Sequence, residues 1–299
     1  MPTDVTSLSL LGVSLLCGAA YALFLVRRRP PAGGASDPWL EGFGALALAC
    51  GYTAGHFAVT RGWTKEWGAW ELQPVWIALA ALVGGCLQAP GERLARGAGH
   101  AVVTLALVSV VIWPGMRSES EDLVTRWTGL LGLGALVLAL SVTTTSLARR
   151  VEGPTVPLGL TVALGGAAAL ALFSHYAKFT LVGGVALALL VPAIVVLGWC
   201  RSRRPGSGAT LVANAILMAL LLGGYLHQMP DDRAPALCFV LVGVAPSSGW
   251  IAAAGRLKET PRRAALVRLA CMSVPVLAAL AIAWLSSGGT DPDYGETGW

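Results

Sequence analysis

Long runs of apolar residues, separated by short polar stretches, make up most of this chain of 299 residues. The runs are about 20 residues long, which is the length that an α-helix needs to cross the hydrocarbon core of a bilayer. Strands of a membrane β-barrel would instead show roughly ten-residue segments of alternating polarity. The pattern therefore predicts an all-α polytopic transmembrane helix bundle with about ten spans. The predicted spans are residues 5–26, 39–60, 71–89, 97–115, 127–147, 155–174, 178–199, 208–227, 235–254 and 264–286.

Composition agrees with lipid as the surrounding solvent. The chain is 55% apolar and only 12% charged, whereas a soluble domain has about 25% charged residues. We expect a single integral membrane domain over residues 1–299 that ends in a short extracytoplasmic tail at 287–299. The formal net charge is +5, but the basic residues lie in short loops between spans. They indicate orientation in a bilayer rather than binding to nucleic acid.

The basic residues favour alternate loops. The set on the predicted cytoplasmic side consists of Arg27, Arg28, Arg29, Arg93, Arg96, Arg149, Arg150, Arg201, Arg203, Arg204, Arg256, Lys258, Arg262, Arg263 and Arg268. The opposite set is smaller and consists of Arg61, Lys65, Arg117, Arg126, Lys178 and Arg233. Because cytoplasmic loops carry the excess of Lys and Arg, this alternation predicts that both termini are extracytoplasmic.

The start of the chain agrees with that orientation. No basic residue precedes the first apolar run, and Arg27 to Arg29 follow it. A cleavable signal peptide has the reverse polarity, so we expect the first segment to remain as a span. These features are typical of a protein of the bacterial inner membrane.

Ten spans divide into two halves of five, near residues 5–147 and 155–286. An odd number of spans in each half would invert the second half, and inverted repeats of this kind build many secondary transporters. The residue similarity between the halves is poor, so a 5+5 inverted repeat is one possible arrangement of the bundle.

Three of the four histidines fall at predicted outer ends of spans, with polar and aromatic residues beside them. If the second, sixth and eighth spans adjoin, these side chains converge on an outward-facing pocket for a metal, an anion or a quinone-like headgroup. Alternatively, the half-polar rings simply lie at the membrane interface. The residues concerned are Tyr52, His56, His175, Tyr225, His227 and Asp231.

The ninth span contains a second candidate, the segment Pro246–Gly249. Proline removes a backbone donor and disturbs the preceding turn, so we expect the helix to bend or unwind there and to face other helices. Broken helices line solute sites in transporters, which makes Ser247 and Ser248 binding candidates. A simple proline kink is the alternative.

Two further polar residues lie inside predicted spans. Asn214, in the inner half of the eighth span, either contacts a solute or hydrogen-bonds a neighbouring helix. Glu41 lies in the first turn of the second span, where a carboxylate complements the positive end of the helix. Polar residues are costly in hydrocarbon and therefore merit attention as functional candidates.

The six cysteines form no CxxC pair and lie within or beside the predicted spans. We therefore expect free thiols rather than disulfides or a zinc site. No pattern predicts a cofactor, a metal or a catalytic group, so an enzyme is the less favoured class.

Three functions remain open. The minimal loops and kinked helices favour a transporter-like or channel-like protein for a small solute. The scarcity of buried charge is equally compatible with a non-catalytic membrane subunit or scaffold, which would bind partner subunits or further copies of the chain. The third is a membrane protein with an outward-facing histidine pocket. A polar cavity near Pro246–Gly249 would favour transport.

Overall fold

The structure is a computed structural model of the chain, and all of the elements that it describes are helical. It describes residues 5–27, 37–60, 72–89, 92–113, 123–173, 177–200, 204–226, 234–254 and 261–287. Every predicted span coincides with a helix in these ranges. The helices are α1 (Val5–Arg27), α2 (Pro38–Val59), α3 (Gln73–Cys86), α4 (Arg93–Leu107) continued by the π-helical turn η2 (Val108–Ile112), α6 (Leu123–Arg150), α7 (Thr155–Phe173), α8 (Ala177–Trp199), α9 (Ser207–Leu226), α10 (Ala236–Ala254) and α11 (Pro261–Ser287).

Seven of the helices are long and apolar enough to cross a membrane, as judged on the described residues. They are α2, α4 with η2, α6, α7, α8, α9 and α11. The apolar described parts of the other three are shorter, namely Leu11–Arg27 in α1, Gln73–Cys86 in α3 and Ala236–Ile251 in α10. Together these helices form an all-helical membrane bundle.

The third span is shorter than predicted. Its helix ends at Cys86, and residues 87–89 form a turn in which the Gln88 N–H donates to the carbonyl of Gly85. Pro90 follows in the sequence, and a proline disfavours helical backbone in the residue before it. The apolar run at 71–89 therefore overestimates the helix.

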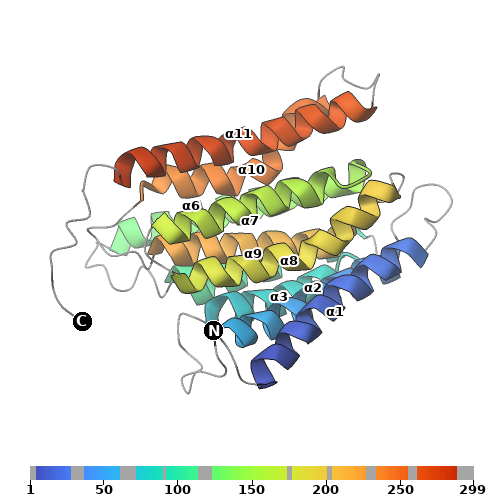
Figure 1. Ribbon diagram of the computed structural model, residues 1–299. Coiled ribbons are helices and arrows are strands. Elements are labelled where there is room, and N and C mark those ends of the chain that lie inside the picture. The colour runs from blue at the N-terminus through green and yellow to red at the C-terminus, as the bar shows by residue number, and fades with distance from the viewer. Residues whose placement is uncertain are drawn as a thin grey trace.

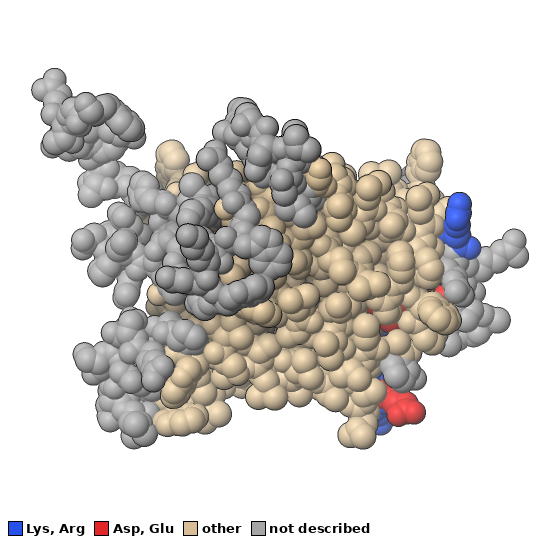
Figure 2. Space-filling view, turned by 90° about the horizontal axis from the view of Figure 1, so that it is seen from below, with Lys and Arg blue, Asp and Glu red and all other residues tan. Residues whose placement is uncertain are grey.

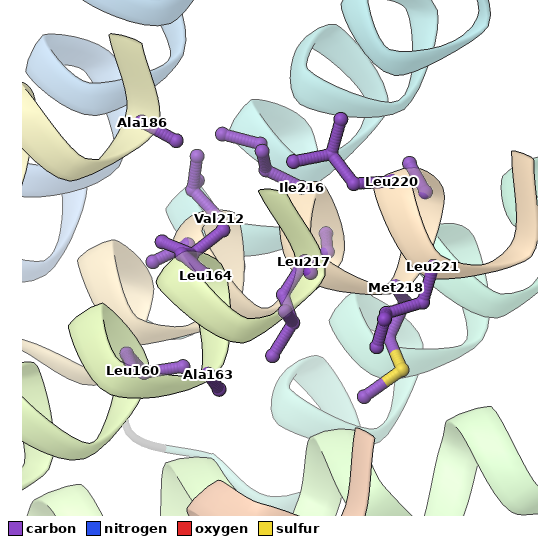
Figure 3. Packing of buried hydrophobic residues seen from close by; sticks show 14 of the residues in the cluster. Leu160, Ala163, Leu164, Ala186, Val212, Ile216, Leu217, Met218, Leu220 and Leu221 are labelled. Atoms are coloured by element: carbon purple, nitrogen blue, oxygen red, sulfur yellow. The ribbon is translucent and has the colours of Figure 1, made fainter. Parts of the chain in front are cut away.

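Helix α9 lies at the centre of the bundle, with α2, α3, α6 and α7 packed around it (Figure 1). Every residue from Ser207 to Leu221 is buried. Figure 3 shows Leu160 and Leu164 of α7 packed beside Val212 and Leu217 of α9. An apolar helix that is buried all round requires neighbours on every side, and the surrounding helices supply them.

The outward-facing side chains of the surrounding helices are mostly apolar, as lipid contact requires. Leu16, Leu131, Val195 and Leu277 are exposed large hydrophobic residues on α1, α6, α8 and α11. The charged side chains that the structure describes are confined to one end of the molecule, and Figure 2 shows the uncharged surface beside them. The surface thus has the division into apolar belt and charged end that a bilayer imposes.

Contacts between helix ends show how the helices alternate in direction. At one end, the start of α2 meets the start of α9 through Glu41 and Gly208, and the end of α6 meets the turn after α3 through Arg149 and Gln88. We call this the charged end. Helix α1 begins, and α11 ends, at the opposite end of the bundle (Figure 1).

Aromatic rings join neighbouring helices at that opposite end. The pairs are Trp113 with Trp127, Phe173 with Trp284, and Tyr225 with Phe239, with ring centroids 5.9, 6.2 and 5.5 Å apart. Each pair brings together residues that the sequence places at outer span ends. The three tryptophans are exposed, which suits indole rings at a membrane interface.

The packing does not repeat between the two halves. A 5+5 repeat would match α1 with α7 and α6 with α11. In the described residues, α7 packs along α11, whereas α1 and α6 show no comparable packing. Similarly, α1 packs along α8 without an equivalent pairing of α7 with α2. The arrangement of helices therefore gives no support to an internal repeat.

Candidate functional site: a buried polar seam

Buried polar side chains gather between α4, α6 and α9, toward the charged end. His100 of α4, Ser141 and Thr145 of α6, and Asn214 of α9 are each at most 5% exposed. We call these four side chains the polar seam. A polar group in hydrocarbon costs several kcal/mol unless it is hydrogen-bonded. In a bundle with few such residues, the seam is the strongest candidate for a functional site.

Helical periodicity places the polar positions of α6 and α9 face to face. Ser141, Thr145 and Arg149 follow one another at intervals of four residues, and therefore share one face of α6. Ser207 and Asn214 lie two turns apart on α9. Helix α6 ends where α9 begins, so the two polar stripes run antiparallel. The α6 stripe is about 12 Å long at 1.5 Å per residue and extends from the charged end into the bundle.

Hydrogen bonds connect the seam across all three helices. The Asn214 amide Nδ2 donates to Ser141 Oγ over 3.1 Å. The Thr145 hydroxyl donates to the backbone carbonyl of Ser141 over 2.8 Å and lies 3.3 Å from His100 Nε2. Two buried atoms, Asn214 Oδ1 and His100 Nδ1, have no hydrogen-bond partner in the described part of the protein.

Glu41 caps a different helix from the one predicted. Asp37 already caps α2, since its Oδ1 accepts a hydrogen bond from the Trp39 N–H over 3.0 Å. Glu41 Oε2 instead accepts from the Gly208 N–H, 2.5 Å away in the first turn of α9. The side chain is only 4% exposed. Its negative charge therefore complements the positive end of α9, the central helix.

Close backbone packing holds this cap in place. A Cβ atom at Gly208 would collide with the carbonyl oxygen of Glu41 and would lie 2.9 Å from that of Gly85. Backbone oxygens cannot rotate away as a flexible side chain can. Helices α2, α3 and α9 consequently meet at a point where glycine is required.

Arg149 connects the Glu41 cap to the polar seam. Its guanidinium donates to Gln88 Oε1 and interacts electrostatically with Glu41. Gln88 Nε2 in turn donates to the Arg96 carbonyl over 3.4 Å. Arg149 is half-buried, so it lies between the enclosed seam and the charged end. The sequence suggested only an orienting role for this arginine.

The Pro246–Gly249 segment faces other helices, as predicted, but the described helix α10 runs through it without unwinding. Ser247 Oγ lies 3.1 Å from Thr144 Oγ1 of α6, and Ser248 Oγ lies 2.7 Å from the Cys271 carbonyl of α11. A Cβ atom at Gly249 would collide with Met272. Both serines thus bond to neighbouring helices, as the simple-kink alternative allows, and their role as binding candidates remains a prediction.

The predicted outward histidine pocket lies largely outside the described residues. His175, His227 and Asp231 are in segments that the structure does not describe. Tyr52 and His56 are buried neighbours on α2, with ring centroids 5.9 Å apart, and Tyr225 packs on Phe239. Helix α2 does adjoin α9. Convergence of the three histidines remains a prediction.

Sequence reasoning identified Asn214 but not the seam around it. A threonine hydroxyl in a helix commonly bonds to its own backbone, and Thr145 does make such a bond. The overlooked signal was the four-residue spacing of Ser141, Thr145 and Arg149, which marks one polar face on an otherwise apolar helix.

Comparison with known proteins found no matching family model, no similar curated protein and no similar solved structure. Within the described residues, no group of three or more His, Cys, Asp or Glu side chains is placed to hold a metal ion. The fold and its apolar helices define the class, a multi-pass α-helical membrane protein.

Proposed function

We propose that this chain is a transporter-like or channel-like membrane protein for a small solute and that the polar seam contacts the solute. The observation that carries the proposal is the pair of buried atoms Asn214 Oδ1 and His100 Nδ1, which find no partner in the described protein. Retaining such groups in hydrocarbon lowers stability. A solute that bonds to them would provide a functional reason for that loss.

The location of the seam supports this role. Ser141 and Asn214 lie about two turns from the charged end on α6 and α9, and Arg149 lies at that end of the same stripe. Polar residues inside membrane proteins commonly mark pathways for solutes or ions. The packed serines of α10 carry less weight, because Thr144 and Cys271 already satisfy them.

The proposal includes ten membrane crossings, with both termini outside the cytoplasm of a bacterial inner membrane. Two features support it. All ten predicted spans coincide with helices, and contacts join predicted inner ends with inner ends and outer ends with outer ends. The excess of basic residues in alternate loops supports the orientation. A 5+5 repeat is not part of the proposal, because the packing does not repeat.

Solute-dependent thermal stabilisation of the purified protein tests the proposed function. A ligand at 100 times its dissociation constant stabilises a protein by about 2.7 kcal/mol. We expect at least one small solute from a metabolite panel to raise the unfolding temperature of the wild type but not of Asn214→Leu. Thr210→Val is the control, because the Thr210 hydroxyl donates to the carbonyl of Gly206, the residue just before its own helix.

A non-catalytic subunit or scaffold predicts a different result. No solute would then stabilise the wild type. Instead, the chain would be purified from mild detergent in a stoichiometric complex with other membrane proteins or with further copies of itself. That result would contradict a transport role.

A further inference from the structure

We propose that the polar seam selects a small, uncharged molecule that donates hydrogen bonds, in the size range from water to urea or glycerol. This inference rests on the proposed function and specifies its solute class. It follows from which atoms of the seam carry hydrogens and which carry only lone pairs.

The hydrogen bonds of Thr145 determine which nitrogen of His100 donates. A threonine hydroxyl has one proton, and we assign that of Thr145 to its own helix, where the carbonyls of Ser141 and Val142 lie 2.8 and 3.2 Å away. Toward His100 Nε2, 3.3 Å away, the Thr145 oxygen can therefore only accept. Nε2 must then carry the hydrogen. In the neutral ring this leaves Nδ1 as a buried acceptor.

Asn214 presents a second acceptor. Its Nδ2 donates to Ser141 Oγ over 3.1 Å, so its Oδ1 is the group that remains without a partner in the described protein. The Asn214 side chain is fully buried. Both orphan atoms of the seam thus require a donor, and a ligand that only accepts hydrogen bonds would leave them unsatisfied.

The nearby charge favours a neutral ligand. Arg149 lies one turn beyond Thr145 on the same face of α6, and its guanidinium also interacts electrostatically with Glu41. A cation would be repelled by this guanidinium and would find only neutral acceptors in the seam. An anion would face two lone-pair atoms. An uncharged donor meets neither penalty.

The spacing of the two α6 residues that bond to Asn214 and His100 is the basis on which we infer the size of the ligand. Asn214 is held by Ser141 and His100 by Thr145, and these two α6 residues are one turn apart, about 5.4 Å along the helix. A molecule with two donor groups a few ångströms apart, or a short row of water molecules, matches that separation.

Flux into proteoliposomes tests the inference. Stopped-flow light scattering would follow water leaving vesicles under a sucrose gradient and the entry of glycerol and urea, with potassium and acetate as charged comparisons. We expect the wild type to conduct at least one uncharged donor and to exclude both ions. Asn214→Leu and His100→Phe should each slow that flux about tenfold, the effect of one lost hydrogen bond. Thr210→Val should retain it.

The outcomes separate this inference from the proposed function. If the wild type moves potassium or acetate, or if both seam variants are folded by size-exclusion chromatography and conduct at the wild-type rate, the inference is wrong while transport stands. If the wild type moves none of the five probes and no solute stabilises it, the proposed function fails as well. Asn214→Leu and His100→Phe lie on different helices, so the flux of the other variant still tests the inference if one of the two does not fold.

Discussion

Glu41 illustrates how a single side chain acquires its role from a distant part of the chain. Its place in the first turn of α2 suggests that it complements its own helix, but Asp37 already performs that function. The Glu41 carboxylate reaches Gly208, which is 167 positions away in the sequence. The hydrogen bond from Gly208 to Glu41 therefore stabilises the docking of α9 on α2.

Replacing Glu41 should destabilise the bundle, and the loss should depend on whether the new side chain can still accept the hydrogen bond from Gly208. Glu41→Ala leaves the Gly208 N–H buried without an acceptor and removes the opposite charge from Arg149. We expect the free energy of unfolding to fall by about 3 kcal/mol. Glu41→Gln keeps an acceptor oxygen and should lower it by about 1 kcal/mol. Denaturant titration in detergent micelles would measure both values.

Asp37→Ala provides the comparison for that experiment. It removes an exposed cap of α2 and should cost about 1 kcal/mol. Equal losses for Glu41→Ala and Asp37→Ala would mean that the buried carboxylate has no special importance for the docking of α9.

At the scale of elements, glycine positions decide how closely helices approach. Gly208 of α9 lies against the backbone oxygens of Glu41 and Gly85. By contrast, a Cβ atom at Gly165 of α7 would meet nothing within 4 Å. Close helix packing therefore requires glycine at position 208 but not at position 165.

We expect Gly208→Ala to lower the free energy of unfolding by about 1–3 kcal/mol, because α2, α3 and α9 must separate to admit the methyl group. Gly165→Ala is the matched control and should be neutral or stabilising by up to about 1 kcal/mol, because alanine favours helical backbone. Unfolding midpoints in detergent would test the pair. Equal effects of the two substitutions would contradict the close approach at Gly208.

Helix α10 shows a second effect of packing at this scale. Pro246 predicts a helix that bends or unwinds. Helix α10 does not unwind there, and Ser247 and Ser248 find partners on α6 and α11. Neighbouring helices and serine side chains can satisfy the groups that a proline frees. The proline thus marks a site of helix contact.

The bond between Thr144 and Ser247 should be measurable by a double-mutant cycle. Thr144→Val and Ser247→Ala each remove one of the two hydroxyls, which lie 3.1 Å apart. We expect a coupling energy of about 0.6 kcal/mol, the average for hydrogen bonds between membrane helices. A cycle of Thr144→Val with Ser273→Ala is the control, because the Ser273 hydroxyl donates to its own helix. It should show no coupling.

At the scale of the whole molecule, the alternation of helix direction bears on the proposed topology. The charged side chains that the structure describes lie at one end, and the aromatic pairs join helices at the other. In the proposed ten-span topology, α1 begins and α11 ends on the same side of the membrane. That proposal, which rests on the positive-inside rule, puts the charged end in the cytoplasm.

Cysteine labelling in intact cells tests that orientation. In a variant without its native cysteines, Glu121→Cys should react with a membrane-impermeant maleimide from outside, and Arg203→Cys should react only after permeabilisation. Both positions lie outside the described residues, and their sides follow from the span count. Labelling of both from the same side would overturn the ten-span topology.

The helices themselves could be predicted from the sequence because apolar runs of membrane length leave the backbone little choice. All ten predicted spans correspond to helices, and α3 was overestimated because Pro90 and the turn before it interrupt an apolar run. Of the site, Asn214 was found because an amide inside a span is conspicuous. His100, Thr145 and Arg149 were missed because each has an ordinary explanation when considered alone.

The sequence by itself determined the class of protein, the helix positions and lipid as the surrounding solvent, because hydropathy and the length of a bilayer crossing are local properties of the chain. Only the tertiary structure decided that α9 is central, that Glu41 caps it, and that His100, Ser141 and Asn214 meet. Apolar helices of similar composition have many ways to pack. The choice depends on close contacts such as that at Gly208, which join residues far apart in the sequence.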